Sequence, residues 1–390
     1  MLIVPLGLAL AIFAVRAMVF QSPPDHPLRA LQPTFADHPD ALIEAAMHDI
    51  GNSARTGGTV SRAAQAALMR VARAAPLAPE PFLTNGTIAQ IAGDDAQAEQ
   101  AFLAARLREP RSAAARYFLA DRFLRTNRIA AGLNETAALA RLSERASQPL
   151  VPALAAYAKT PGAIPELRRF FHASPRNRDL TLATLALDPA NADLILALAP
   201  ALPNRQVPPP DWQPRLIRSL VETGDYSAAE QVWRTINGVQ SRGLLFDPGF
   251  RNSTASPPFG WHLTSGSAGV AQASVSGGLD IIYYGREEAA FASQLVRLPP
   301  GSYRLGMQVK APLTTGGLAW SVTCAVGARQ KLMQLPLSSG RAGIVASNFT
   351  VPAADCPAQT IELHGQPVDS PDTAKATITG LDLVPAGSAP

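Results

Sequence analysis

The stretch that decides the first half of the fold is residues 79–110, PEPFLTNGTIAQIAGDDAQAEQAFLAARLREP. Apolar and small residues recur at helical spacing on both sides of residues 93–95, so the stretch predicts two helices joined by a tight turn. Gly86 and Ala98 are small, which lets two antiparallel helices approach closely. Residues 79–110 therefore predict a helical hairpin.

The residues of this hairpin follow an order of bulky, small, small, bulky, small and proline. They are Phe82, Gly86, Ala98, Phe102, Ala105 and Pro110. The order resembles the tetratricopeptide repeat, a helix pair of about 34 residues. Phe102 and Ile91 are expected to fill the groove to the next pair. The resemblance implies an array of helix pairs that binds a protein partner in its concave groove.

Similar units lie on both sides. A turn at residues 126–128 keeps the repeat period, residues 211–238 repeat the pattern, and residues 38–75 form another pair around Gly57-Gly58. Between 145 and 210, prolines cut the pattern into short helices. We therefore expect residues 35–240 to form one tetratricopeptide-like α-solenoid of about five helix pairs.

After residue 240 the apolar period changes from helical to alternating. Tyr303, Leu305, Met307 and Val309 would share one face of a strand, as would Leu318, Trp320, Val322 and Cys324 on another. Further strands are expected at 268–275, 279–284, 289–298, 329–337, 343–351, 358–364 and 374–384. Residues 241–386 thus predict an antiparallel β-sandwich with a jelly-roll layout.

The β module opens with LFDPGFRN at 245–252 and PPFGWHL at 257–263. This opening, followed by many short strands, resembles the jelly-roll modules related to carbohydrate-binding domains. The resemblance implies that polysaccharide is a possible ligand. The candidate ligand-binding residues are Trp261, Tyr284, Arg286 and Glu287, an aromatic platform beside charged hydrogen-bonding groups. The same residues also fit a solvated hairpin tip and, for Trp261, a core position.

The only two cysteines, Cys324 and Cys356, lie in this module. Two cysteines confined to one β-rich region favour a disulfide formed in an oxidising compartment. Two free buried thiols are the alternative.

The chain begins with an apolar stretch whose first charge is Arg16. Residues 1–20 are predicted to be a signal peptide or an inner-membrane anchor, and residues 21–34 a proline-rich spacer. A buried N-terminal helix is the alternative. We expect a periplasmic protein, anchored in the inner membrane or secreted after signal cleavage.

No catalytic or cofactor-binding motif occurs in the sequence, and its histidines show no metal-ligand spacing, so we expect no enzyme, cofactor or metal site. The net charge of +4 is spread along 390 residues without a basic block, which does not favour a nucleic-acid partner.

These features together suggest a non-catalytic periplasmic scaffold. Its helical array would bind a protein partner and its β module a glycan, in exopolysaccharide assembly or export. One alternative is a purely protein-binding envelope assembly factor with a structural sandwich. Another is a polysaccharide-modifying enzyme.

Overall fold

The computed structural model describes most of the chain. The described residues are 18, 27, 31, 34–56, 60–202, 208–240, 243–251, 255–310, 317–326, 330–337, 343–367 and 373–387. The predicted signal or anchor, the proline-rich spacer and the Gly57-Gly58 turn lie wholly or largely outside them. In the part of the chain that is described, no helix combines the length and apolar character that a membrane span requires.

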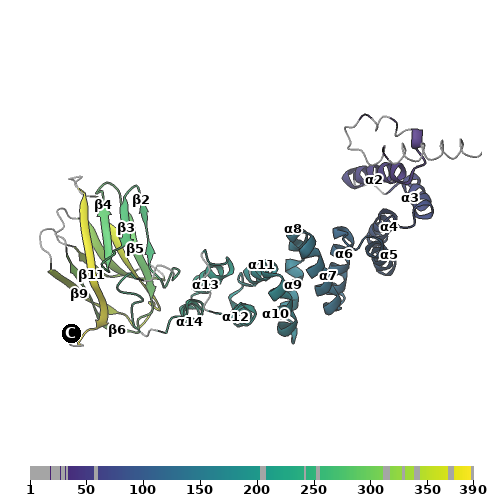
Figure 1. The fold of residues 1–390 in the computed structure, drawn as a ribbon. Helices are drawn as coiled ribbons and strands as arrows, with labels where there is room; N and C mark the ends of the chain where they lie inside the picture. The colour runs from purple at the N-terminus through teal and green to yellow at the C-terminus, as the bar shows by residue number, and fades with distance from the viewer. Residues whose placement is uncertain are drawn as a thin grey trace, which may run out of the picture. The chain divides into compact units, whose positions relative to one another are not determined.

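Helices make up the first half of the chain (Figure 1). They are α2 (Pro39–Thr56), α3 (Arg62–Ala74), α4 (Glu80–Ile91), α5 (Asp95–Arg108), α6 (Ala113–Arg125), α7 (Ile129–Leu142), α8 (Glu144–Ser147), α9 (Val151–Ala158), α10 (Ala163–Ala173), α11 (Pro175–Leu185), α12 (Ala192–Leu198), α13 (Trp212–Glu222) and α14 (Tyr226–Asn237), with short 3-10 turns η2 (Gln148–Leu150) and η3 (Pro189–Asn191).

Two of the helix pairs are closed by the same kind of turn. Gly93 and Gly224 adopt φ angles of 78° and 81°, a left-handed conformation that glycine tolerates without steric cost. The next residue in each case, Asp94 or Asp225, caps the following helix by accepting a hydrogen bond from a backbone N–H three residues on. Asn127, with φ 58°, takes the left-handed position between α6 and α7. Local sequence therefore fixes these turns.

The packing of α4 against α5 depends on a missing side chain. A Cβ built on Gly86 would lie 2.8 Å from the ring of Phe102, which is itself buried. Ala98 and Ala105 are buried as well. The expectation that Ile91 fills the groove to the next pair is wrong, because its side chain is 80% exposed. Ile91 is the last residue of α4, and its side chain faces solvent there.

The remaining predicted repeat residues lie at the end of this hairpin. The guanidinium of Arg108 stacks 3.6 Å above the centre of the Phe82 ring. Pro110 is exposed and follows the last residue of α5 by two positions. Pro110 thus follows the end of α5, and Phe82 of α4 lies against the last residue of that helix, Arg108.

The strands form two antiparallel sheets. They are β1 (His262–Leu263), β2 (Ser265–Gly266), β3 (Gly269–Ala273), β4 (Leu279–Tyr283), β5 (Ala289–Val296), β6 (Gly301–Val309), β7 (Leu318–Cys324), β8 (Lys331–Pro336), β9 (Gly343–Val351), β10 (Gln359–Gly365) and β11 (Ala374–Pro385). The five-stranded sheet has the order β1-β5-β10-β7-β8, and the six-stranded sheet has the order β2-β3-β4-β11-β6-β9. This confirms a helical region followed by a β-sandwich.

The inner faces of the two sheets enclose one apolar core. Trp320, Tyr283 and Phe291 are its largest fully buried side chains. Cys324, at the end of β7, is joined to Cys356 by a disulfide with an S–S distance of 2.03 Å. The cysteine pair that the sequence favours therefore closes one end of the core.

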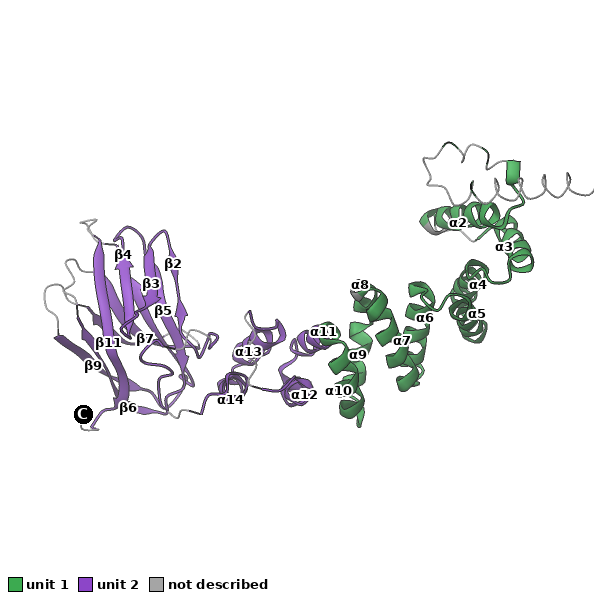
Figure 2. Ribbon diagram, viewed as in Figure 1, with its two compact units in different colours: residues 1–177 green, residues 178–390 purple. Residues whose placement is uncertain are grey.

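The chain divides into two compact units, residues 1–177 and 178–390 (Figure 2). In the second unit, Trp233 of α14 is fully buried against Phe246 and Phe259. Its indole N–H donates a hydrogen bond to the Ser256 carbonyl oxygen at 2.6 Å. The last helix pair thus packs onto the segment that leads into the sandwich.

Candidate ligand-binding face of the β module

The outer face of the five-stranded sheet carries polar side chains on its central strand, β10. Gln359, Ile361 and Leu363 are all fully buried. Because successive side chains of a strand point to opposite faces, Thr360, Glu362 and His364 belong to the outer face. This alternation places a line of polar groups at the middle of the sheet.

The strand register extends this line into a row that crosses the whole sheet. The residues of the row, in order from β1 to β8, are His262, Ser293, Glu362, Ser321 and Gln334. Each is the direct cross-strand partner of the next. Neighbouring strands lie about 4.8 Å apart, so the row is about 19 Å long. We call these five residues the polar row.

The polar row changes in exposure along its length. His262 and Gln334, on the two edge strands, are exposed, whereas Ser321 near the middle is only 5% exposed. A hydrogen bond to a shielded group competes less with water and is electrostatically stronger than one at the rim. Ser321 is largely covered, so the half-buried Glu362 is the better-placed group for hydrogen bonding to a ligand near the middle of the polar row.

Parallel to the polar row lie two shorter sets of cross-strand partners. Thr360 pairs with Thr323, and His364 pairs with Ala319. Burial lowers the pKa of His364, and the nearby charge of Lys331 lowers it further, against the opposing effect of Glu362 and Glu288. The imidazole is accordingly neutral at pH 7, with one nitrogen able to donate and the other able to accept.

The turn that contains three of the predicted site residues joins the two sheets. Residues 284–288 connect β4 of the six-stranded sheet to β5 of the five-stranded sheet, so they are not a hairpin tip within one sheet. Tyr284 is partly buried, and its backbone N–H donates to the Ala268 carbonyl oxygen. Arg286 is exposed. The turn thus carries Tyr284, Arg286 and Glu287, which are near neighbours along the chain.

Glu287 of this turn already has hydrogen-bond partners. Its carboxylate accepts a bond from the Ser267 hydroxyl at 2.6 Å, and its carbonyl oxygen accepts one from the Tyr283 hydroxyl at 3.2 Å. Burial raises the pKa of Tyr283, and the charges of Glu288 and Glu287 raise it further. Part of the hydrogen-bonding capacity of this turn therefore holds the turn in place.

Trp261, the fourth predicted site residue, lies elsewhere. Its indole N–H donates to the Asp247 carbonyl oxygen at 2.9 Å, and its ring stacks on Phe250 with 4.6 Å between centroids. The ring also meets Trp320 edge-on. Among the described residues, no hydrogen bond or ring contact joins it to the turn at 284–288. Trp261 is packed against the core.

The first unit has a hollow of about 310 Å³ between α7 and α10. Its lining residues are Ala130, Leu133, Asn134, Ala137, Glu166, Arg169, Phe170 and Ala173. Glu166 accepts a hydrogen bond from the Tyr157 hydroxyl at 2.8 Å. Burial, together with this bond, raises the pKa of Tyr157 to about 12. The hollow combines an apolar floor with one acidic and one basic group.

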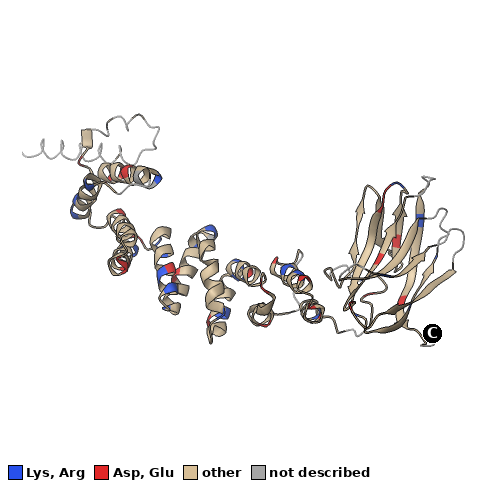
Figure 3. Cartoon of the chain, turned by 180° about the vertical axis from the view of Figure 1, so that it is seen from behind, with Lys and Arg blue, Asp and Glu red and all other residues tan. Residues whose placement is uncertain are grey.

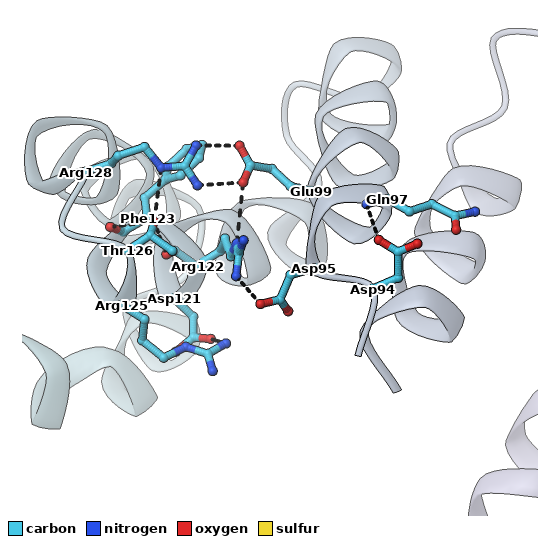
Figure 4. Close-up of polar contacts among 10 residues, drawn as sticks. All are labelled: Asp94, Asp95, Gln97, Glu99, Asp121, Arg122, Phe123, Arg125, Thr126 and Arg128. Atoms are coloured by element: carbon cyan, nitrogen blue, oxygen red, sulfur yellow. Dashed lines mark hydrogen bonds and ion pairs between the residues drawn. The ribbon is translucent and has the colours of Figure 1, made fainter. Parts of the chain in front are cut away.

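Ion pairs join successive helix hairpins in the first unit (Figure 4). Arg128 donates to Glu99 of α5 through Nη1 and Nη2 of its guanidinium, and Arg122 of α6 pairs with Glu99 and Asp95. The hydrogen bond from Arg128 is the main cause that holds the pKa of Glu99 below its ordinary value. Figure 3 marks the acidic and basic residues along the chain, and both kinds occur on the helices of the first unit. The ion pairs around Glu99 form a structural contact.

A second group of ion pairs is more buried. Glu135 of α7 is 6% exposed and accepts hydrogen bonds from Arg106 of α5 and from Arg116 of α6, the latter at 2.7 Å. Three helices are thus held by one carboxylate. Such a carboxylate is a structural group, because its oxygens are used within the fold.

The sequence did not single out the polar row. Alternation along the strand correctly places Ser321 and Thr323 on the face opposite to that of Trp320. A row across five strands, however, depends on which residues of neighbouring strands pair. That register is set by turns and tertiary packing. Groups of three or more metal-ligating side chains are absent from the described residues.

No known protein-family profile matches this chain, and no curated protein is similar to it in sequence. Solved structures that match part of this chain include TmCBM61 in complex with β-1,4-galactotriose, 19% identical over 37% of this chain and 99% of that one, with a TM-score of 0.28. A family 16 carbohydrate-binding module is 18% identical over 36% and 99%, with a TM-score of 0.27. The CBM22-1 xylan-binding domain from Paenibacillus barcinonensis Xyn10C is 12% identical over 36% and 93%, with a TM-score of 0.26.

Proposed function

We propose that this chain is a non-catalytic scaffold whose β module binds a saccharide across the outer face of the five-stranded sheet. The polar row is the observation that carries the proposal. A saccharide presents hydroxyl groups that donate and accept hydrogen bonds. The row offers a carboxylate, two hydroxyls, an amide and an imidazole along one line.

The shape of the row suits a linear ligand. Its ends at His262 and Gln334 are exposed, so a chain longer than the row can continue past both edges of the sheet. Glu362 lies at the centre, where its carboxylate would accept hydrogen bonds from sugar hydroxyls. We infer that a polysaccharide segment lies across the strands, with Glu362 as its central contact.

The strand order supports a jelly-roll interpretation of the sandwich. Strands β4 to β11 alternate between sheets except at β7 and β8, and give the orders β4-β11-β6-β9 and β5-β10-β7-β8. An eight-stranded jelly roll, which is built from two Greek keys, has this arrangement. We interpret β1, β2 and β3 as additions to it.

The helix pairs are, in this proposal, a tetratricopeptide-like array that docks a protein. Small residues at Gly86 and Ala98 and the repeated turns at Gly93 and Gly224 support this interpretation. The hollow between α7 and α10 is the candidate docking position, since Glu166 and Arg169 would select a partner segment by charge.

The proposed location is the bacterial envelope, with residues 1–20 as the inner-membrane anchor or signal and exopolysaccharide assembly or export as the process. The disulfide between Cys324 and Cys356 supports an oxidising compartment. The runner-up is a purely protein-binding assembly factor in which the sandwich is structural, supported by the packed position of Trp261.

A glycan array that includes bacterial exopolysaccharides tests the proposal on the full chain. We expect binding to a defined saccharide class. Glu362→Ala should weaken it about 10- to 100-fold, the usual effect of losing a hydrogen bond to a charged group. Asp382→Ala is the matched control, because Asp382 is an exposed carboxylate on the six-stranded sheet.

Two results would count against this function. If no saccharide binds the folded chain, the runner-up takes its place. If the bound saccharide is cleaved or modified during incubation, the module is an enzyme. The proposal predicts that the saccharide is recovered unchanged.

A further inference from the structure

Another hollow, with a polar lining, lies in the second unit, bordered by α14 and by Arg297 just after β5. Its volume is about 540 Å³. Its lining includes Ser227, Glu230, Gln231, Arg234, Thr235 and Arg297. None of these belongs to the polar row or to the turn at 284–288.

The charged part of this hollow is a group of two arginines around one carboxylate. Glu230 accepts a hydrogen bond from Arg234 Nε at 2.9 Å through Oε1 and one from Arg297 Nη1 at 3.0 Å through Oε2. One negative and two positive groups leave a net charge of +1. The site therefore favours an anion.

Arg297 has hydrogen-bonding capacity left over. Its side chain is 36% exposed, and in the described part of the chain Glu230 is its only partner, reached through Nη1. A guanidinium has five N–H donors in a planar fork, which matches the two oxygens of a carboxylate. Arg297 is thus able to bind a second carboxylate in addition to that of Glu230.

The neutral part of the hollow is polar. Ser227, Gln231 and Thr235 are exposed and follow one another at intervals of four residues, so they share one face of α14. The Thr235 hydroxyl donates to the Gln231 carbonyl oxygen of its own helix, which leaves its lone pairs for a ligand donor. None of the lining residues is aromatic. Hydroxyl-rich ligands fit this lining better than flat aromatic ones.

We propose that this hollow binds an acidic sugar, a uronic acid, with its carboxylate on Arg297 and its hydroxyls on Ser227, Gln231 and Thr235. The site uses a helix outside the sandwich and is independent of the polar row. Its existence would make the second unit a two-site receptor for acidic polysaccharide. If the polar row binds nothing, this site still stands.

Calorimetric titration of the full chain tests the site, with glucuronic acid and a disaccharide that contains glucuronic acid as ligands. Glucose, acetate and a short acidic peptide serve as comparisons. We expect glucuronic acid to bind, glucose and acetate to bind at least tenfold more weakly, and the affinity for glucuronic acid to fall as salt is added. Arg297→Gln should reduce that affinity at least tenfold. Arg297→Lys should restore only part of it, since an ammonium cannot form the fork.

Because Arg297 also pairs with Glu230, its loss could perturb the fold. Gln231→Ala is the second variant, since it changes only a neutral lining side chain, and it should weaken binding severalfold without a change in melting temperature. Arg304→Gln, on the six-stranded sheet, should leave glucuronic acid binding unchanged.

Absence of glucuronic acid binding by the wild-type chain would overturn the proposal. So would unchanged binding by Arg297→Gln and Gln231→Ala, or equal affinity for the acidic peptide, which would mark a peptide site.

Discussion

The two regions of this chain are stabilised in different ways. In the first unit, apolar residues form separate small clusters, such as that of Ala98, Phe102 and Leu119, and ion pairs join successive hairpins. In the sandwich, both sheets share one core that contains Trp320 and is closed by a disulfide. A repeat array tolerates local loss because each hairpin depends on its neighbours alone. A single core does not.

The junctions between elements show the same contrast. In the first unit, α5 contacts α6 and the residue before α7 partly through arginines and carboxylates near the surface. In the second unit, α14 contacts the segment before the sandwich through the buried ring of Trp233. Apolar burial contributes more free energy than exposed ion pairs and is insensitive to salt. Four predictions test this difference, from the largest expected effect to the smallest.

The largest effect is expected for Trp233→Ala. Removal of a buried tryptophan typically costs about 3–5 kcal/mol. We expect the second unit to unfold at a lower temperature and the first unit to keep its melting temperature, as measured by scanning calorimetry. Trp233→Phe keeps the ring contact but loses the bond to Ser256, so its effect should be intermediate. Equal destabilisation of both units would show that the two units do not unfold independently.

The disulfide is the next test. Replacing both cysteines, by Cys324→Ser and Cys356→Ser together, opens a loop with a sequence separation of 32 residues. The chain-entropy estimate gives a loss of about 3–4 kcal/mol from the second unit. Urea unfolding followed by tryptophan fluorescence measures it, with the untreated and dithiothreitol-treated wild type as comparison. An unchanged midpoint would show that the core alone determines the stability of the sandwich.

Two glycine substitutions in the first unit compare a closely packed helix position with an open one. Gly86→Ala places a Cβ against the buried Phe102 ring and should destabilise the first unit by about 1–3 kcal/mol through overpacking. At Gly51 of α2 no atom lies within 4 Å of an added Cβ, so Gly51→Ala should stabilise the unit by up to about 1 kcal/mol through helix propensity. Melting temperatures that move in opposite directions are the expected result. A shift in the same direction would refute the close approach of α4 and α5.

The smallest effect is expected for Glu99→Gln, which removes the pairs with Arg122 and Arg128. Since the folded pKa of Glu99 lies below its ordinary value of 4.5, its contribution is present above that pH and is lost as the pH falls through the lowered pKa. The wild type should therefore lose stability relative to the variant below about pH 4.5. A difference between the two that persists at lower pH, or that high salt does not reduce, would exclude an electrostatic cause.

Local patterns predicted the elements of this fold well. The expected strands at 343–351 and 358–364 lie within one residue of β9 and β10, because alternation is encoded in each strand by itself. The turn at Gly93 was likewise predicted from short-range chemistry, and the turn at Gly224 repeats it. The inward positions of Tyr303, Leu305 and Trp320 are correct for the same reason.

What depends on distant contacts was not predicted. The exposure of Ile91 at the end of α4 depends on tertiary packing that the local pattern does not show. The polar row requires the register of five strands, and the hollow at Arg297 requires the approach of α14 to the end of β5. Tyr284, Arg286 and Glu287 lie in one turn, whereas Trp261 packs against the core. Their role in ligand binding stays a prediction.

The most direct test of the central proposal is a crystal structure of the chain with the saccharide that the array selects. The proposed function predicts sugar density across the five-stranded sheet, with a hydroxyl within hydrogen-bond distance of the Glu362 carboxylate. Density on the outer face of the six-stranded sheet, or only on the helices of the first unit, would contradict it.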